Sequence, residues 1–263
     1  MLALLSPAKT LDFDTPLPPA PRATKPRLLG DSAELAAVLR RLRAGDLQRL
    51  MDISPALADL NADRFAAWTD RPARGTARPA IFAFRGDVYR GLDVDALDPP
   101  ALESARDRLR ILSGLYGLLR PFDAILPHRL EMGTALPTDR GENLYRFWGD
   151  RITRLLVKDL RDSGSRALIN LASNEYARSV RMDAVPVPVL TPVFREVRDG
   201  RSRTLALFAK EARGMMARFI ATEAIDDPEG LRDFRGGGYR FQSRDSDDAT
   251  LVFSRPQPPP VSK

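Results

Sequence analysis

The chain contains no cysteine and a single histidine, His128, among its 263 residues. The absence of cysteine excludes disulfides, thiolate metal sites, iron–sulfur clusters and a cysteine nucleophile. One histidine also excludes a metal site built from several imidazoles, so a direct iron site would need oxygen ligands almost alone. We therefore expect no resident metal and no cofactor. A serine–histidine triad would have to use His128. This residue is expected in a loop, between Pro127 and Arg129, which argues against such a triad.

Long apolar runs are also missing. No run approaches the roughly 20 residues that a membrane-spanning helix needs, and no charged-then-apolar leader with a cleavage site is present. Apolar residues make up 43% of the sequence and charged residues 29%, which is typical of a globular protein. We expect a cytoplasmic protein without a membrane partner.

Common enzyme signatures are absent as well. The sequence has no Walker loop, no Gly-x-Gly-x-x-Gly after an expected strand, no Gly-x-Ser-x-Gly and no His-Glu-x-x-His. No standard motif therefore assigns an enzymatic activity.

Positive charge is in excess, and arginine carries most of it. The formal net charge is +6 at pH 7. The guanidinium group is planar and always charged, which suits phosphate. This balance favours a nucleic-acid or nucleotide partner, although an arginine-rich coding background produces the same balance without one.

The stretch Leu109–Gly133 has the most informative pattern. A helical periodicity enters it and stops at Ser113, where a turn bracketed by Gly114 and Gly117 begins. A second apolar pair follows and ends at Arg120, because the residue before a proline is pushed out of the helical region. The simplest interpretation is a helix, a glycine-bracketed hairpin and a short second helix.

Such a turn can bind phosphate. Successive backbone N–H groups beside a helix N-terminus form a concavity for anions, and Arg120 would add a bidentate donor. The alternative is a structural turn in which Gly114 and Gly117 only let two helices pack closely.

Several apolar runs predict buried strands whose ends can form a site. Met1–Leu5 leads to Lys9, Ala80–Phe84 leads to the polar segment Arg85–Leu92, and Ala167–Leu171 is a third such run. Open α/β sheets place their ligands at the carboxyl ends of strands. Lys9 is therefore a candidate anion contact.

A second group of cations lies near the start of the expected helix Ala209–Phe219. Lys210, Arg213 and Arg218 fall on one helical face, and cations at a helix start oppose the helix dipole unless an anion is present. The pattern favours a phosphate site. A carboxylate such as Glu175 or Glu131 could instead provide the negative charge.

We expect the strand ends to converge on one cleft. Lys9, Lys210 and Arg213 would line it with Arg120 near its rim. Carboxylates in a basic cleft repel phosphate, so acidic residues there would indicate base recognition or acid–base chemistry. The polar candidates for this cleft are Glu131, Asn170, Ser173, Glu175 and Tyr176.

Seven segments together resemble a known family. They read, in order, LLSPAKTLDF, FRGDVYRGL, LSGLYGLLRP, RLEMG, LYRFWGD, INLASNEY and FAKEARGMMARF. Because they occur in one order over most of the chain, the sequence resembles the peroxide-stress-resistance YaaA family as a whole.

The resemblance implies a cytoplasmic bacterial protein that protects against hydrogen peroxide by limiting free intracellular iron. It also implies a single mixed α/β domain and DNA binding through a helix-hairpin-helix-like element at Leu112–Arg120. Helix-hairpin-helix turns usually carry Gly-x-Gly, whereas this turn reads Gly-Leu-Tyr-Gly.

We therefore expect a single α/β domain over residues 1–254, with a mixed β-sheet surrounded by helices, and a disordered proline-rich tail over residues 255–263. The expected function is DNA binding, mainly through backbone phosphates, in the peroxide stress response. An enzyme acting on a nucleotide or nucleobase in the basic cleft is the alternative. An adaptor with an unknown protein partner is a third possibility.

Overall fold

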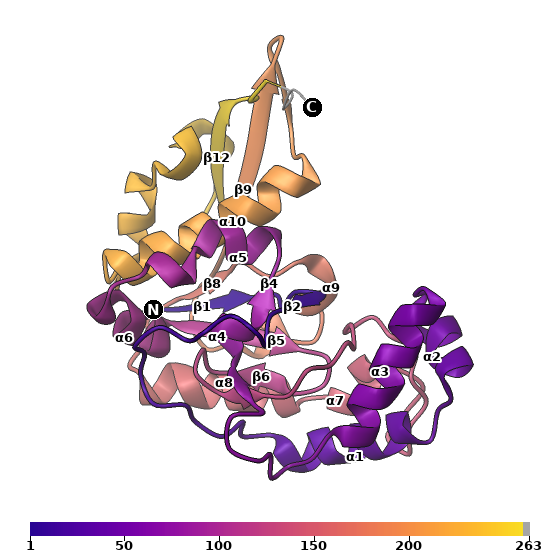
Figure 1. Ribbon diagram of the computed structural model, residues 1–263. Coiled ribbons are helices and arrows are strands. Elements are labelled where there is room, and N and C mark those ends of the chain that lie inside the picture. The colour runs from indigo at the N-terminus through magenta and orange to yellow at the C-terminus, as the bar shows by residue number, and fades with distance from the viewer. Residues whose placement is uncertain (260–263) are drawn as a thin grey trace.

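The apolar run at the start of the chain forms strand β1 (Leu2–Leu5), and all four of its side chains are buried. In the computed structural model, which describes residues 1–259, β1 lies inside the main sheet (Figure 1). It pairs in parallel with β5 (Leu109–Ser113) on one side and with β8 (Leu168–Asn170) on the other. A parallel strand with both faces covered needs apolar residues at successive positions, which explains the unbroken run.

The main sheet has eight strands, in the order β11-β12-β9-β8-β1-β5-β6, with β10 paired to β9. The neighbours from β12 to β5 run parallel, whereas β6, β10 and β11 pair antiparallel with their partners. The expected α/β domain with a mixed sheet is confirmed. The remaining strands of this sheet are β6 (Gly117–Leu119), β9 (Val189–Arg198), β10 (Arg201–Arg203), β11 (Arg240–Phe241) and β12 (Thr250–Pro256).

Two short ribbons and a set of helices surround this sheet. The ribbons pair β2 (Thr10–Leu11) with β4 (Phe84–Arg85), and β3 (Arg78–Pro79) with β7 (Ala124–Ile125). None of the helices within residues 1–259 combines the length and apolar composition that a membrane span needs. The α-helices are α1 (Leu29–Arg40), α2 (Ala44–Met51), α3 (Pro55–Ala67), α4 (Ala80–Ala83), α5 (Asp87–Leu92), α6 (Pro99–Arg108), α7 (Leu144–Trp148), α8 (Arg151–Asp162), α9 (Asn174–Ala177) and α10 (Ala206–Thr222).

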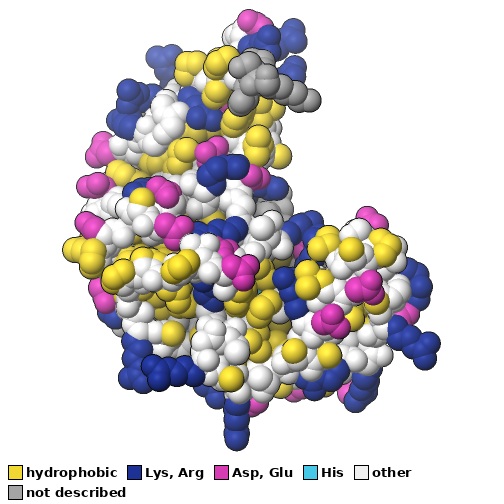
Figure 2. All heavy atoms as spheres, in the orientation of Figure 1, with side chains coloured by type: hydrophobic (Ala, Val, Ile, Leu, Met, Phe, Trp, Pro, Cys, Tyr) yellow, Lys and Arg dark blue, Asp and Glu magenta, His cyan; other side chains and the backbone are white. Residues whose placement is uncertain are grey.

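The molecule is crescent-shaped in the view of Figure 1. One horn consists of β9, β12 and the hairpin that joins β9 to β10, and the other consists of α1, α2 and α3. The space-filling view shows a deep hollow between the two horns (Figure 2). Strand β2 and helix α9 lie at the inner side of this hollow.

The expected helix-hairpin-helix at Leu112–Arg120 is wrong. Helix α6 ends at Arg108, and the chain then forms the antiparallel hairpin of β5 and β6. All five residues of β5 are buried within the sheet, so the apolar spacing that fits a helix here fills both faces of a strand instead. No phosphate-binding turn between two helices is therefore present at this point.

Both glycines of the hairpin are required by close packing. A Cβ on Gly114 would lie 2.3 Å from the Leu130 carbonyl oxygen. Gly117 has a φ of +68°, and a Cβ there would lie 2.8 Å from the Trp148 ring. Close packing, the structural alternative for these glycines, is what the structure shows, but the partners are the Leu130 backbone and the Trp148 ring and not two packed helices.

Other local expectations also change. Most of the run Ala80–Phe84 forms helix α4 rather than a central strand, and most of the following polar segment forms helix α5. The apolar spacing of Asn143–Leu160 predicts one long helix, but the structure divides it into α7 and α8 at Gly149, whose φ is +48°.

The C-terminal segment differs in part from the expected tail. Arg255 and Pro256 continue strand β12, which packs in parallel against β9. Strand β12 also pairs antiparallel with β11. The rest of the expected tail includes residues 260–263, which lie outside the described residues.

Helices α5 and α10 touch backbone to backbone at two glycines. A Cβ on Gly91 would lie 2.0 Å from the Glu211 carbonyl oxygen, and one on Gly214 would lie 1.8 Å from the Val88 carbonyl oxygen. No side chain fits in either position. This contact fixes where α10 presents its first turns.

Replacing either glycine by alanine should therefore push α5 and α10 apart. We expect Gly91→Ala and Gly214→Ala each to lower the free energy of unfolding by about 1–3 kcal/mol, as overpacked sites do. Urea denaturation measures this loss. The matched control is Gly30→Ala in α1, where nothing lies within 4 Å of the added Cβ, and it should raise stability by about 0.5–1 kcal/mol. Equal effects at all three positions would contradict the close approach.

Candidate functional site

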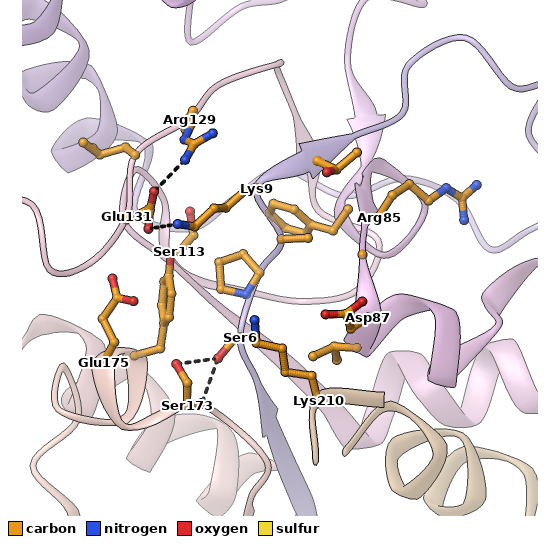
Figure 3. Close-up of a pocket in the computed structure, with 18 of the residues that line it drawn as sticks. Ser6, Lys9, Arg85, Asp87, Ser113, Arg129, Glu131, Ser173, Glu175 and Lys210 are labelled. Carbon is orange, nitrogen blue, oxygen red and sulfur yellow. Dashed lines mark hydrogen bonds and ion pairs between the residues drawn. The ribbon is translucent and has the colours of Figure 1, made fainter. Parts of the chain in front are cut away.

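A cavity of about 350 Å³ opens where three neighbouring strands end. Ser6 follows β1, Ser113 is the last residue of β5, and Ser173 follows β8, and all three line this cavity (Figure 3). Because these strands are parallel and adjacent, their carboxyl ends meet at one edge of the sheet. We call this cavity the strand-end pocket.

Hydrogen bonds hold the first and last of these loops together. The Ser6 Oγ accepts from the Ser173 backbone N–H at 2.8 Å and donates to the Ser173 Oγ at 3.3 Å. The Tyr89 hydroxyl donates to the Ser6 carbonyl at 3.1 Å. Burial raises the pKa of Tyr89 well above its usual value, so this donor keeps its proton.

One wall of the strand-end pocket carries a three-membered charge cluster. The Lys9 Nζ lies 2.7 Å from one oxygen of Glu131, and the Arg129 Nη2 donates to the other oxygen at 3.1 Å (Figure 3). The exposed fractions differ, since the Lys9 side chain is 62% exposed and that of Glu131 is 23% exposed. Two cations share one carboxylate, so the cluster is net positive.

A second carboxylate stands beside this cluster. The Glu175 Oε1 accepts from the Gly133 backbone N–H at 2.9 Å, which fixes the side chain toward the pocket (Figure 3). The neighbouring Tyr176 is buried. Burial, and then the nearby Glu175 and Glu131 carboxylates, raise the pKa of Tyr176, so its ring stays neutral.

Two further cations come from α10. Lys210 and Arg213 both line the strand-end pocket. Neither side chain makes an ion pair or a hydrogen bond with any residue in the described part of the chain. Burial lowers the pKa of the Arg213 guanidinium, because no acidic partner offsets the loss of water around it. An unpaired, half-buried guanidinium is a favourable place for an anion.

The lining residues have more positive than negative side chains. Arg85 is satisfied by Asp12 and Asp95 outside the pocket, and Asp87 pairs with Arg90. The excess charge therefore concentrates at Lys210 and Arg213. The charged lining residues are Lys9, Arg85, Arg129, Lys210 and Arg213 against Asp87, Glu131 and Glu175.

His128 lies in the floor of the strand-end pocket. Its Nδ1 is 2.9 Å from the Leu126 carbonyl, so we assign the proton to Nδ1. Its ring makes edge-on contacts with Phe84 and Tyr116. Burial, with a smaller contribution from Arg64, lowers the pKa of His128 to about 4, so the imidazole is neutral near pH 7.

The pocket offers binding groups rather than an activated nucleophile. The Ser6 and Ser173 hydroxyls bond to each other, and no serine of the pocket hydrogen-bonds to His128 in the described chain. Within residues 1–259, no three His, Asp or Glu side chains are arranged to hold a metal ion. The Lys9–Glu131 pair and Glu175 are candidate groups for proton transfer in the pocket.

The structure brings together most of the residues expected in one cleft. Their roles in binding stay predictions, since only their positions are seen here. The expected residues that line the strand-end pocket are Lys9, Glu131, Ser173, Glu175, Tyr176, Lys210 and Arg213.

The other expected site residues lie elsewhere and have structural contacts. Arg120 donates to Asp123 and to the Lys25 carbonyl, in a different cavity at the opposite end of the strands. Arg218 donates to the carbonyls of Leu92, Asp93 and Ala96. Asn170 accepts from the Ala172 backbone N–H, while Gly114 and Gly117 serve the hairpin.

The sequence patterns do not identify every residue of the pocket as a site candidate. Arg85 and Asp87 belong to a polar segment whose composition is typical of a binding loop, but nothing in that composition distinguishes these two residues from their neighbours. The periodicity before Ser113 predicts that this residue ends a helix, whereas the structure shows that it ends strand β5. Arg129 and His128 come from a loop without periodicity, so only the tertiary fold places them.

Comparison with known proteins gives one consistent result. A family model described as "Peroxide stress protein YaaA" matches residues 1–245. A UPF0246 protein of Caulobacter vibrioides is 52% identical over 98% of this chain and 100% of its own length. UPF0246 proteins of Laribacter hongkongensis and Aliivibrio fischeri are 49% and 48% identical, each over 97% of this chain and 99% and 98% of their own lengths.

The buried histidine makes stability depend on pH. The folded-state pKa of His128, about 4, lies below the ordinary value of 6.5, so the folded protein binds this proton less readily than the unfolded chain. Its contribution is complete above about pH 6.5 and declines as the pH falls toward 4. Between pH 7.5 and 5, we expect the free energy of unfolding to fall by roughly 2 kcal/mol more in the wild type than in His128→Gln. Urea denaturation at several pH values measures this difference. If the wild type and His128→Gln lost the same free energy of unfolding over this range, His128 would not be the cause.

Proposed function

Because the chain belongs to the YaaA family of peroxide stress proteins, we propose that it acts in the peroxide stress response by binding DNA, mainly through backbone phosphates on its concave side. The observation that carries the proposal is the pair Lys210 and Arg213, which face the strand-end pocket without an acidic partner in the described chain. A half-buried guanidinium has lost part of its hydration, and here no carboxylate of the described chain compensates for that loss. A phosphate oxygen would accept the hydrogen bonds that the guanidinium can donate.

The horn above the pocket supplies further cations. Arg198, Arg201 and Arg203 are exposed at the hairpin of β9 and β10. Lys and Arg side chains gather at the top of this horn in Figure 2. Helix α10 follows directly after β10 in the chain, so the hairpin arginines and the pocket cations belong to one continuous segment. A DNA backbone that enters the hollow would meet both groups.

The proposal extends to the limitation of iron-linked damage in the bacterial cytosol, which the family resemblance implies. The chain has no thiolate and one neutral, buried imidazole, so its residues offer no strong soft-ligand site for Fe(II). We therefore place the action on DNA rather than on iron itself.

Binding to phosphates predicts a linear fall of log K with log salt concentration. The slope should be about −0.9 for each phosphate neutralised on duplex DNA. Removing both pocket cations with Lys210→Gln and Arg213→Gln should reduce the slope by about 1.8 units, and fluorescence anisotropy with a labelled duplex measures it.

The matched control is Lys158→Gln in α8, whose cation pairs with Asp162 and lies outside the strand-end pocket. This variant should keep the wild-type slope. If the double variant kept that slope as well, the pocket cations would not touch phosphate. A wild type that does not bind duplex at low salt would end the DNA proposal.

An enzyme acting on a nucleotide or nucleobase is the second candidate. The observation that favours it is the presence of Glu131 and Glu175, in addition to the paired Asp87, in a cavity whose lining is net basic, since a pure phosphate site has no use for carboxylates. The paired Lys9 and Glu131 could exchange a proton with a bound base.

Glu131→Gln and Glu175→Gln separate the two candidates. Removing a carboxylate removes repulsion, so both variants should bind duplex DNA as well as the wild type or better. If they also lose peroxide protection in a deletion strain, base recognition or acid–base chemistry takes place in the pocket. Full protection by both variants would leave the carboxylates as structural partners of the cations and remove the enzyme hypothesis.

A further inference from the structure

The strand-end pocket has two chemically different sides. In Figure 3 the carboxylates of Glu131 and Glu175 lie on one side with Lys9 and Arg129, and Lys210 and Asp87 lie on the other. Asp87 is already paired with Arg90. Phosphate would therefore fit Lys210 and Arg213 on the second side, whereas the Glu175 carboxylate, which has no cationic partner in the described chain, would repel it on the first, acidic side. A ligand that uses the whole pocket must therefore join an anionic group to a group rich in hydrogen-bond donors.

The acidic side has an acceptor to offer. Glu175 uses its Oε1 for the Gly133 backbone N–H, and its Oε2 accepts no hydrogen bond within the described chain. An ionised carboxylate can only accept hydrogen bonds. Next to it, Lys9 and Arg129 hold Glu131 from either side and also provide donors.

Aromatic side chains also contribute to the lining. Tyr176, Phe84 and His128 belong to it, and both Tyr176 and His128 are uncharged near neutral pH. An uncharged aromatic lining is compatible with a planar heterocycle.

Size restricts the form of the ligand. About 350 Å³ is at the lower end of the range for small-molecule sites, which suits a single nucleotide. A base pair within a duplex cannot enter such a volume. The ligand must be a free nucleotide or a nucleotide turned out of a strand.

We propose that the strand-end pocket binds one unpaired guanine nucleotide, with its phosphate on Lys210 and Arg213 and its base edge toward Glu175. Among the four DNA bases, guanine alone presents two adjacent N–H donors, N1–H and the 2-amino group, on its Watson–Crick edge. Its O6 acceptor is next to them, where Lys9 or Arg129 can donate. This assignment rests on the proposed function, because DNA bound by the protein would supply the nucleotide that turns out of its strand into the pocket.

Guanosine and inosine monophosphate provide a matched pair of ligands, because they differ only in the 2-amino group. Titration calorimetry should show that the wild type binds guanosine monophosphate roughly 10-fold to 100-fold more tightly than inosine monophosphate, the range expected for a hydrogen bond to a charged acceptor. Equal affinities would overturn the guanine assignment.

Glu175→Gln tests the acceptor without removing its structural contact. The amide oxygen of glutamine can still accept from the Gly133 N–H, while the amide nitrogen replaces the free acceptor with a donor. The preference for guanosine monophosphate should disappear in this variant. It should persist in Glu229→Gln, an exposed carboxylate outside the pocket that pairs with Arg232. A preference that survives Glu175→Gln would contradict the assigned acceptor.

The phosphate end has its own test. Arg213→Gln should weaken the binding of guanosine monophosphate at least 10-fold and leave the binding of guanosine, which has no phosphate, unchanged. Equal losses for both ligands would show that Arg213 supports the pocket instead of contacting phosphate.

Duplexes with one unpaired nucleotide distinguish the two sources of the ligand. If the guanine comes from DNA, a duplex with a bulged dG should bind at least 10-fold more tightly than the same duplex with a bulged deoxyinosine. Salt-dependent duplex binding without any response to guanine would defeat this inference and leave the proposed function standing. Guanosine monophosphate binding without DNA binding would defeat the proposed function and identify a free nucleotide as the ligand.

Discussion

The parallel pairing of β1 with β5 on one side and β8 on the other is the constraint on which the rest of the molecule depends. These strands come from distant parts of the chain, and their pairing brings the segments after them to one edge of the sheet. The apolar run of β1 makes this pairing favourable, because a strand buried on both faces removes every one of its side chains from water. The strand-end pocket exists because three loops leave the sheet at the same place.

The close contact of α5 and α10 completes the pocket from a different direction. Gly91 and Gly214 let the two helix backbones meet, so α10 presents Lys210 and Arg213 opposite the loops that follow the strands. The pocket thus combines a wall built by the sheet with a wall built by helix packing. Its two sides come from these two sources. Glu131 lies in a loop and Glu175 lies in helix α9 after β8, whereas Lys210 and Arg213, which have no acidic partner in the described chain, belong to α10.

Charge compensation separates structural arginines from candidate binding arginines. At the opposite end of the strands, Arg27 and Arg110 both donate to the buried carboxylate of Asp159. Burial there acts against ionisation, but the two guanidinium groups outweigh it and lower the pKa of Asp159. Arg213 is half-buried, and none of the described residues provides it with such a partner. The difference between these arginines lies in their neighbours and not in their residue type.

The sequence by itself determined the class of fold and the family. The apolar runs predicted β1 and β8, and seven ordered segments indicated the family. The segments after β1 and β8 contribute Lys9, Ser173, Glu175 and Tyr176 to the pocket, because residues after buried strands share one edge of a parallel sheet. These features depend on local patterns, which a sequence records directly.

Only the tertiary structure decided the form of Leu109–Ser113 and the partners of the charged residues. That segment has apolar residues at spacings that satisfy a helix and a doubly buried strand equally well, and its pairing with β1 selects the strand. In the same way, Arg120, Arg218 and Arg213 are alike in sequence, but the first two donate to nearby acceptors and the third faces an open pocket. An ion pair between residues far apart in the chain depends on where the fold places both partners, and no local pattern contains that information.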